Sequence, residues 1–262
     1  MKIAIFAYED YDFLYGMLQR LVDGIHERGR DQVVGLLLFP NCLAGRKGLR
    51  IPLYYACLLG PFVFLKLVFR SVWNMIQRYG TCVLGRTRSV TYQGWCRTHD
   101  ISCKSFSGPN RQEVVDWVKE NDIDVVLIFI GQILKQPILA APHKCVLNKH
   151  AAILPAFKGL LPVFWAQKEK MPVGVTIHKV VEEIDSGDIL VQEDCPDRLS
   201  SVYAMYRHIF ARAPALIQEA LDVVAGERPV RKSANNTFPS SYYGLPSRRD
   251  YLAFLKAGGR FV

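Results

Sequence analysis

The chain of 262 residues lacks the features that mark several large classes of protein. Its seven cysteines are an odd number and none form a CxxC pair, which argues against a disulfide framework or a CxxC metal site. Its longest charge-free stretch is shorter than the ~20 apolar residues of a membrane-spanning helix. The N-terminus, MKIAIFAYED, has only a short apolar run followed by acids, so no signal peptide is predicted. We therefore expect a cytoplasmic protein.

The composition indicates a folded protein with a basic surface. Hydrophobic residues make up 50% of the chain and charged residues 22%, enough apolar surface for a packed core. The formal net charge is +9, which favours anionic partners such as nucleotides, polyglutamylated cofactors, nucleic acid or acidic lipid. The length allows one α/β domain with an insertion or a tail.

The order of apolar runs predicts a doubly wound α/β fold with a mostly parallel sheet. Residues 2–8 and 33–39 have the length of buried strands, and the helix expected between them ends near Gly29. A second helix, 111–121, precedes the fully apolar strand 125–130. Strand, helix, strand is the repeating unit of this Rossmann-like fold, which binds ligands at the carboxyl ends of its strands.

Shorter elements follow in the second half of the chain. We expect strands at 145–147, 174–180 and 187–192 and a helix at 162–168. A longer helix, 200–226, should be interrupted by Pro214. The predicted domains are a catalytic domain, 1–230, and a tail, 231–262, that lies across the surface.

An insertion of about residues 41–100 interrupts the α/β pattern. Residues 51–65 carry no charge, but Gly60-Pro61 breaks the run, so we expect helices too short to span a membrane. Two interpretations stay open. The insertion is buried or forms a lid, or about 51–79 lies on a membrane surface or a partner, with Lys66, Arg70 and Arg78 suited to an anionic interface.

The most informative stretch runs from Val146 to Leu190. It contains Asn148-x-His150 just after a strand, an Ile-Leu-Pro-x-x-Lys-Gly loop ending at Gly159, the strand Gly-Val-Thr-Ile-His178, and Asp185-Ser-Gly-Asp-Ile-Leu190. Taken singly, these residues fit turns or structural roles. Together they resemble the signature of the folate-dependent formyltransferases, which include glycinamide ribonucleotide, methionyl-tRNA and aminosugar N-formyltransferases.

The resemblance implies a site and a reaction. Its catalytic residues would be Asn148, His150 and Asp185. The formyl donor would be 10-formyltetrahydrofolate, bound by two loops formed by Gly131, Gln132, Ile133, Leu134, Val181, Glu182 and Glu183. Lys158, Gly159 and Trp165 are candidates for binding the acceptor, although Lys158 could also be solvated and Trp165 could belong to the core. His178 is expected to be structural, and no metal is expected.

These side chains suit formyl transfer to an amine. An asparagine amide can donate a hydrogen bond to the oxygen that becomes negative, a contribution of roughly 3 kcal/mol to lowering the barrier. A histidine can take the proton of the amine or pass one to the leaving nitrogen. An aspartate beside the imidazole stabilises its protonated form and fixes its orientation.

Departures from individual relatives narrow the acceptor. Residues 7–11, Ala-Tyr-Glu-Asp-Tyr, replace the phosphate loop of glycinamide ribonucleotide formyltransferase, and two acids disfavour a phosphate there. Only about thirty residues follow 230, too few for the C-terminal barrel of methionyl-tRNA formyltransferase, so no nucleic-acid partner is expected. A small anionic amine, such as a nucleotide-linked aminosugar, is the expected acceptor. The alternatives are a 10-formyltetrahydrofolate hydrolase and a non-catalytic folate-binding or membrane-associated protein.

Overall fold

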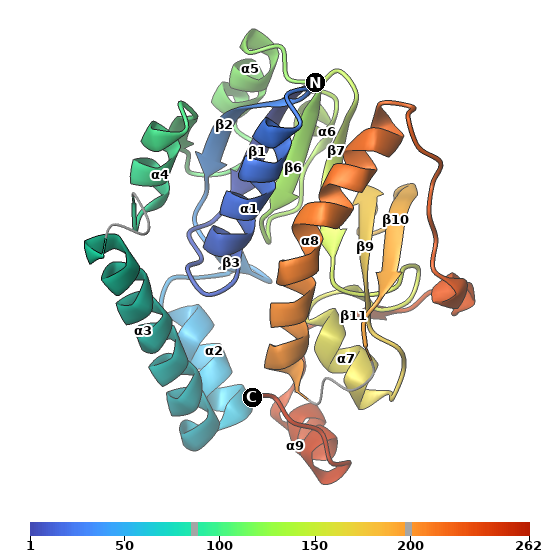
Figure 1. Cartoon of the computed structure of the whole chain (residues 1–262). Coiled ribbons are helices and arrows are strands. Elements are labelled where there is room, and N and C mark those ends of the chain that lie inside the picture. The colour runs from blue at the N-terminus through green and yellow to red at the C-terminus, as the bar shows by residue number, and fades with distance from the viewer. Residues whose placement is uncertain (85–88, 197–200) are drawn as a thin grey trace. The chain divides into compact units, whose positions relative to one another are not determined.

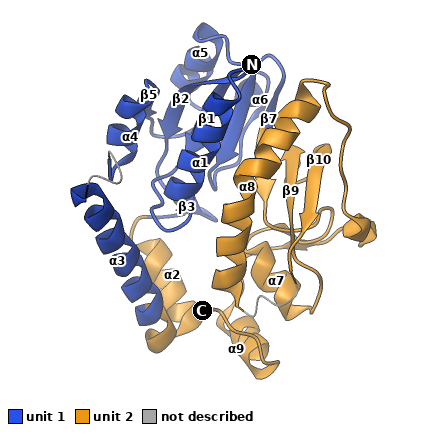
Figure 2. Cartoon of the chain, viewed as in Figure 1, with its two compact units in different colours: residues 1–47, 65–146 blue, residues 48–64, 147–262 orange. Residues whose placement is uncertain are grey.

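The computed structural model describes residues 1–84, 89–196 and 201–262. These residues form two compact units, one of residues 1–47 and 65–146 and the other of residues 48–64 and 147–262 (Figure 2). Both units contain strands and helices (Figure 1). The predicted α/β class, with mostly parallel strands, is confirmed.

The first unit is built on four parallel strands. In spatial order these are β6 (Val125–Phe129), β1 (Lys2–Ala7), β2 (Gln32–Leu38) and β5 (Ser102–Ser105). Strand β1 pairs with both β2 and β6, so its side chains from Ile3 to Ala7 are fully buried. The apolar runs predicted as strands 2–8, 33–39 and 125–130 are therefore strands.

The helices of this unit follow from the apolar pattern. Helix α1 (Leu14–Glu27) buries the predicted face, and Gly29 follows its end with a φ of +64°, a conformation that suits glycine after a helix. Helix α5 (Gln112–Glu120) buries Val114, Val115 and Val118. The remaining short elements are a hairpin of β3 (Cys42–Leu43) and β4 (Arg46–Lys47) and helices α4 (Tyr92–Thr98) and α6 (Gln136–Leu139).

The insertion is helical, and its first two helices are largely exposed, whereas α4 buries Tyr92, Trp95 and Cys96. Helix α2 (Arg50–Leu59) ends at Gly60, whose φ is +80°, and α3 (Pro61–Val83) begins at the next residue. Of these two helices, α2 buries only Leu58 and Leu59 and α3 buries no residue. The interpretation of a buried insertion does not hold for α2 and α3, and the interpretations of a lid and of a surface segment stay predictions. Within the described ranges, none of the helices combines the length and hydropathy that crossing a membrane requires.

Antiparallel strands form the sheet of the second unit. Strands β7 (Cys145–His150) and β10 (Ile189–Asp194) lie on either side of β9 (Gly174–Lys179). The predicted strand 145–147 continues to His150, so Asn148 and His150 lie within the strand itself. Helix α7 (Pro162–Lys168) has the predicted bounds, and a two-residue strand, β8 (Lys158–Gly159), precedes it.

Helix α8 (Val202–Val224) differs from the prediction at Pro214. The helix runs through this proline without a break, although a proline removes one hydrogen bond of the helix. Ala213, Pro214, Leu216 and Ile217 are buried, and α8 packs on β9 and β10. The packing of the apolar face therefore outweighs the local penalty. The predicted start at Ser200 lies outside the described residues.

The last thirty residues carry more structure than expected. They contain the short helix η1 (Ala234–Thr237), strand β11 (Tyr242–Tyr243) and helix α9 (Arg248–Lys256), which begins with a capping box of Ser247 and Asp250. Strand β11 pairs with β8, and Tyr251 and Phe254 are buried. The tail therefore packs within the second unit, and the boundary at 230/231 stays a prediction.

Candidate functional site

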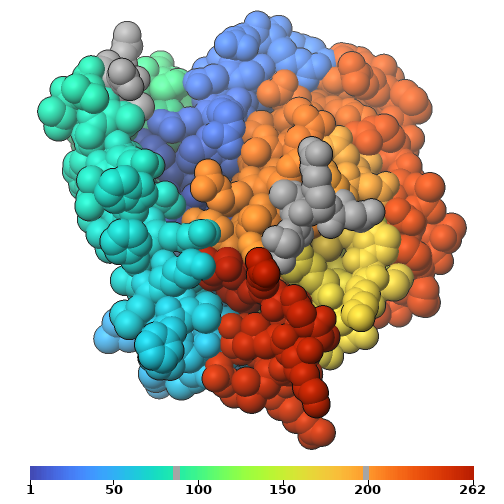
Figure 3. Space-filling view, turned by 60° about the horizontal axis from the view of Figure 1, so that its bottom comes forward, coloured from blue at the N-terminus to red at the C-terminus, as the bar shows by residue number. Residues whose placement is uncertain are grey.

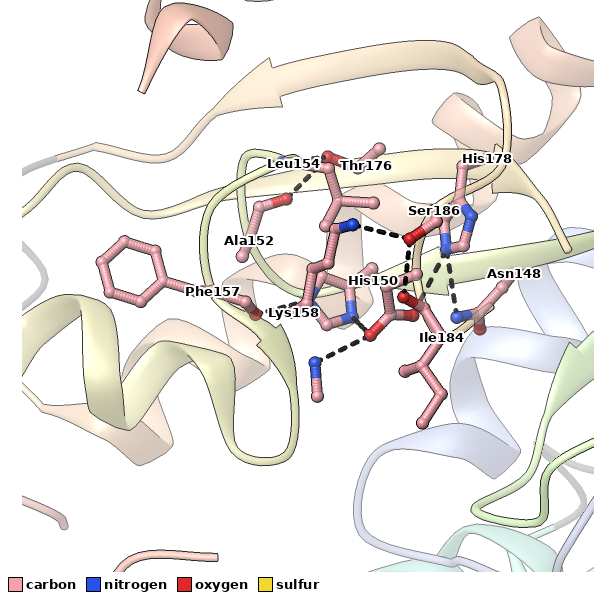
Figure 4. Close-up of polar contacts among 12 residues, drawn as sticks. Asn148, His150, Ala152, Leu154, Phe157, Lys158, Thr176, His178, Ile184 and Ser186 are labelled. Carbon is pink, nitrogen blue, oxygen red and sulfur yellow. Dashed lines mark hydrogen bonds and ion pairs between the residues drawn. The ribbon is translucent and has the colours of Figure 1, made fainter. Parts of the chain in front are cut away.

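Two antiparallel strands place four polar side chains on one face of the sheet. Asn148 and His150 are two residues apart on β7, and successive side chains of a strand alternate between faces. On β9, His178 lies opposite Asn148, and Thr176 lies opposite His150. Residues directly opposite one another share a face, so the four side chains are neighbours. Figure 4 shows this cluster.

The hydrogen bonds of His150 define its basic nitrogen. Nε2 lies 2.8 Å from the backbone oxygen of Phe157. A carbonyl oxygen only accepts, so Nε2 carries a proton and donates it to this bond. In the neutral ring the lone pair is then on Nδ1, which lies 3.5 Å from Oδ2 of Asp185. His150 is therefore oriented to accept a proton on the nitrogen that faces the carboxylate.

His178 orients Asn148. Nδ1 of His178 donates to the backbone oxygen of Lys179 at 2.8 Å, which leaves Nε2 as an acceptor in the neutral ring. The amide nitrogen Nδ2 of Asn148 lies 3.3 Å from this Nε2 and donates to it. Because this bond fixes the orientation of the Asn148 amide group, it also fixes the direction of the second N–H of that group.

Burial keeps His178 neutral. Its side chain is only 2% exposed, and this burial, together with the charge that His150 carries when protonated, lowers the pKa of His178 to about 4. The nearby carboxylate of Asp185 opposes this shift but does not overcome it. The acceptor role of Nε2 toward Asn148 is therefore maintained at neutral pH.

Asp185 connects both histidines. Its Oδ2 lies 3.5 Å from Nδ1 of His150 and its Oδ1 lies 3.6 Å from Nε2 of His178. Asp185 has a φ of +50°, and Oδ2 accepts a hydrogen bond from the backbone N–H of Gly159 at 2.8 Å. Gly187 allows the loop to pass close to β9, because a Cβ there would lie 2.0 Å from the oxygen of Lys179. The structure thus brings together the three residues predicted as catalytic.

Lys158 and Gly159 lie beside this cluster on β8. Nζ of Lys158 donates to Oγ of Ser186 at 2.6 Å and lies 4.0 Å from a carboxylate oxygen of Glu183. The lysine therefore holds the loop that carries Asp185. Gly159 has a φ of +93°, and a Cβ at this position would lie 2.3 Å from the oxygen of Tyr243.

Trp165 is buried under the tail. Its ring stacks on Tyr243 with centroids 4.7 Å apart, and its Nε1 donates to the backbone oxygen of Gly244 at 3.0 Å. Tyr243 also stacks on Phe157, the residue whose oxygen accepts from His150. The sequence pattern gave no signal for this contact, because it joins segments almost eighty residues apart.

The first predicted folate loop, Gly131–Leu134, is held in a fixed shape. Asn110 donates to the backbone oxygen of Ile133 and accepts from the N–H of Lys135, both at 2.8 Å. Gln132 donates to the oxygen of Pro40, whereas its own Oε1 is buried and has no hydrogen-bond partner among the described residues. The loop therefore offers the exposed side chain of Ile133 to a ligand.

The second predicted folate loop follows β9. Val181, Glu182 and Glu183 are exposed, and the loop leads directly to Asp185. Within the described segments, no group of three or more His, Cys, Asp or Glu side chains could hold a metal ion. The roles assigned to these loops, and the expectation that no metal takes part, stay predictions.

By sequence, the chain is similar to known formyltransferases. Residues 97–220 match the model of the formyl transferase family. Methionyl-tRNA formyltransferase of Bacillus mycoides is 33% identical over 153 residues, which cover 53% of this chain and 45% of that protein. The enzyme of the same name from a Geobacillus species is 34% identical, covering 51% and 43%. The chain thus spans less than half the length of these curated relatives.

Solved structures agree in fold. A sugar N-formyltransferase from a Shewanella species superposes with a TM-score of 0.59 at 17% identity, covering 98% of this chain and 87% of that one. Glycinamide ribonucleotide transformylase 1 from Symbiobacterium toebii gives 0.58 at 17%, covering 88% and 92%. At this identity the likeness concerns the fold alone. The segment of residues 97–220, which holds Asn148, His150 and Asp185, is thus similar in sequence to the formyl transferase family, and the chain is similar in fold to solved structures of formyltransferases.

Proposed function

We propose that this protein is an N-formyltransferase that moves a formyl group from 10-formyltetrahydrofolate to a primary amine of a small acceptor. The observation that carries the proposal is the position of the Asp185 carboxylate, 3.5 Å from His150 and 3.6 Å from His178. His178 in turn holds Asn148. An amide donor, a base and a carboxylate that orients the base are the groups that this transfer requires.

Asn148 stabilises negative charge. When the amine attacks the formyl carbon, the carbonyl oxygen becomes negative, and an amide N–H can donate to it. Since His178 accepts one N–H of Asn148, the direction of the amide group is fixed before the reaction. A preorganised donor of this kind typically contributes a factor of about 10² to 10³ in turnover.

His150 moves the proton. The attacking amine must lose a proton, and the folate nitrogen that leaves must gain one. Nδ1 of His150 is the nitrogen with the lone pair, and the Asp185 carboxylate beside it stabilises the imidazolium that forms. The same proton can then be delivered to the leaving nitrogen, so the enzyme returns to its initial state.

The donor would be bound by the two loops predicted from the sequence. The family uses formyl-tetrahydrofolate, and this folate carries a pterin ring. The exposed side chains of Ile133 and Val181 offer apolar contact to this ring. Glu182 and Glu183 contribute their backbone groups in this proposal.

The acceptor is a small amine, with a nucleotide-linked aminosugar as the leading candidate. At the start of α1, the Asp10 carboxylate accepts from the N–H groups of Asp12 and Phe13, both at 2.8 Å. These are the groups that a phosphate at this helix end would need, so a ribonucleotide phosphate is disfavoured there. Lys158 and Gly159 are the residues nearest the acceptor in this proposal, whereas the buried Trp165 supports them from below the tail. The location we propose is the cytoplasm, at a membrane surface through the segment 51–79.

The test is release of tetrahydrofolate from 10-formyltetrahydrofolate, followed by absorbance, with a panel of amines that includes nucleotide-linked aminosugars. We expect release that requires one amine, and that falls by a factor of about 10² or more in Asn148→Ala and His150→Ala. Release without any amine would identify a hydrolase. Donor binding without release under any condition, unchanged in both variants, would identify a non-catalytic binding protein.

A further inference from the structure

Helix α3 turns the polar residues of its C-terminal half and the half-buried Phe64 and Leu67 toward the protein, and most of its other apolar side chains outward. In the space-filling view this helix lies at the surface (Figure 3). Ser71 and Asn74 donate hydrogen bonds to the carboxylate of Asp12, and Arg78 lies over the ring of Tyr11 at 4.1 Å and donates to its backbone oxygen. These three residues recur every three or four positions and so define one side of the helix. A surface helix of a soluble protein normally has the opposite orientation.

The opposite side of α3 is a continuous apolar surface, which we name the outward face of α3. Its residues are all exposed: Phe62, Leu65, Val68, Phe69, Val72, Trp73, Met75, Ile76, Tyr79 and Val83. Phe69 is 68% exposed and Trp73 51%. At 100° per residue these positions cover about half the circumference, along a helix about 35 Å long. An apolar surface of this extent marks an interaction site.

The charge around this face has one sign. No Asp or Glu occurs between residues 32 and 99, whereas nine Lys and Arg do. The rest of the chain carries 24 of the 33 basic residues and all 24 acidic ones, so the whole formal charge of +9 resides in this segment. Next to the outward face of α3, Lys66 is exposed and Arg70 half-buried on one edge of the helix.

We propose that the outward face of α3 docks on an anionic lipid bilayer, lying in the plane of its surface. Apolar and aromatic side chains would enter the boundary between headgroups and acyl chains, and the cations on the edge would meet lipid phosphates. Trp73 and Tyr79 suit this boundary, since each has an apolar ring and a polar atom. A second copy of the chain would instead place cations against cations, because no carboxylate lies within the segment.

The experiment is flotation of the protein with vesicles of phosphatidylcholine, alone or with added phosphatidylglycerol. We expect binding that increases with the anionic lipid and decreases with salt. Phe69→Glu places a charge at the centre of the outward face and should abolish binding. Lys66→Glu lowers the charge at the edge of the face by two units and should weaken binding to anionic vesicles roughly 30-fold at low salt.

Matched controls are available elsewhere on the surface. Leu252→Glu introduces the same charge at an exposed apolar position of α9, and Lys119→Glu makes the same charge reversal on α5. Both should bind like the parent protein, and circular dichroism should be the same for all variants. Two results would overturn the proposal: no binding to either vesicle, or a dimer in vesicle-free solution that Phe69→Glu separates. Equal binding of Phe69→Glu and Leu252→Glu would overturn it as well.

Discussion

At the scale of single residues, the Asp185 carboxylate has three partners in the candidate site. Its carboxylate faces two imidazoles and also accepts from the N–H of Gly159. Asp185→Asn keeps an oxygen for Gly159 but loses the charge that stabilises protonated His150. We expect turnover to fall roughly 100-fold or more, with little change in melting temperature. Asp188→Asn, on the same loop but with an exposed side chain, is the control and should retain full turnover.

His178 predicts a pH dependence of stability. Burial lowers its pKa to about 4, below the ~6.5 of an unfolded histidine. Between these values the unfolded chain binds a proton that the folded protein does not, so His178 makes stability fall as the pH decreases from about 6.5 to 4. His178→Gln removes this contribution, and urea unfolding at several pH values should show a shallower decline for the variant. Equal slopes for the two proteins would contradict the assignment of a neutral, buried His178.

The sequence predicted which residues lie in the candidate site better than it predicted the hydrogen bonds between them. Asn148, His150 and Asp185 stand in a spacing that resembles one family, and the structure brings them together. The part of His178 was missed, because it depends on the register in which β7 pairs with β9. A single sequence does not specify antiparallel register between strands that are more than twenty residues apart.

At the scale of elements, the two-residue strand β11 supports the site from the tail. Tyr243 stacks on Trp165 and on Phe157, with centroids 4.7 and 5.5 Å apart. Tyr243→Ala should lower the free energy of unfolding by about 1–3 kcal/mol, since each aromatic pair contributes about 0.5–1.5 kcal/mol beyond burial. It should also lower turnover, because Phe157 holds His150. The neighbouring Tyr242 is 60% exposed, so Tyr242→Ala should change stability by less than about 0.5 kcal/mol.

The elements that were predicted well have strong local signals. Strands β1, β2 and β6 are uninterrupted apolar runs, and α1 and α5 have a clear helical period. The predictions failed where contacts between residues far apart in the sequence determine the structure. Pro214 stays helical because the buried face of α8 packs on the sheet, and α3 faces outward because its polar residues bind Asp12 and Tyr11. Neither contact can be predicted from the local helix propensity of the sequence.

At the scale of the whole molecule, the composition gives the net charge but not where along the chain the excess charge lies. A net charge of +9 indicates an anionic partner, but residues 32–99 carry all of it. The family match, by contrast, covers residues 97–220. The excess charge and the proposed catalytic residues are therefore encoded in separate parts of the chain, which favours a role of the charge in the proposed docking on anionic lipid.

The most direct test of the central claim follows the formyl group itself. The protein is incubated with 10-formyltetrahydrofolate carrying a ¹³C-labelled formyl group and with the amine that supports release, and the amine is analysed by mass spectrometry. We predict that the label appears on the amine nitrogen as a formamide, and that His150→Ala leaves the amine unlabelled. Label recovered only as free formate, or label on the amine at an equal rate in His150→Ala, would contradict the account.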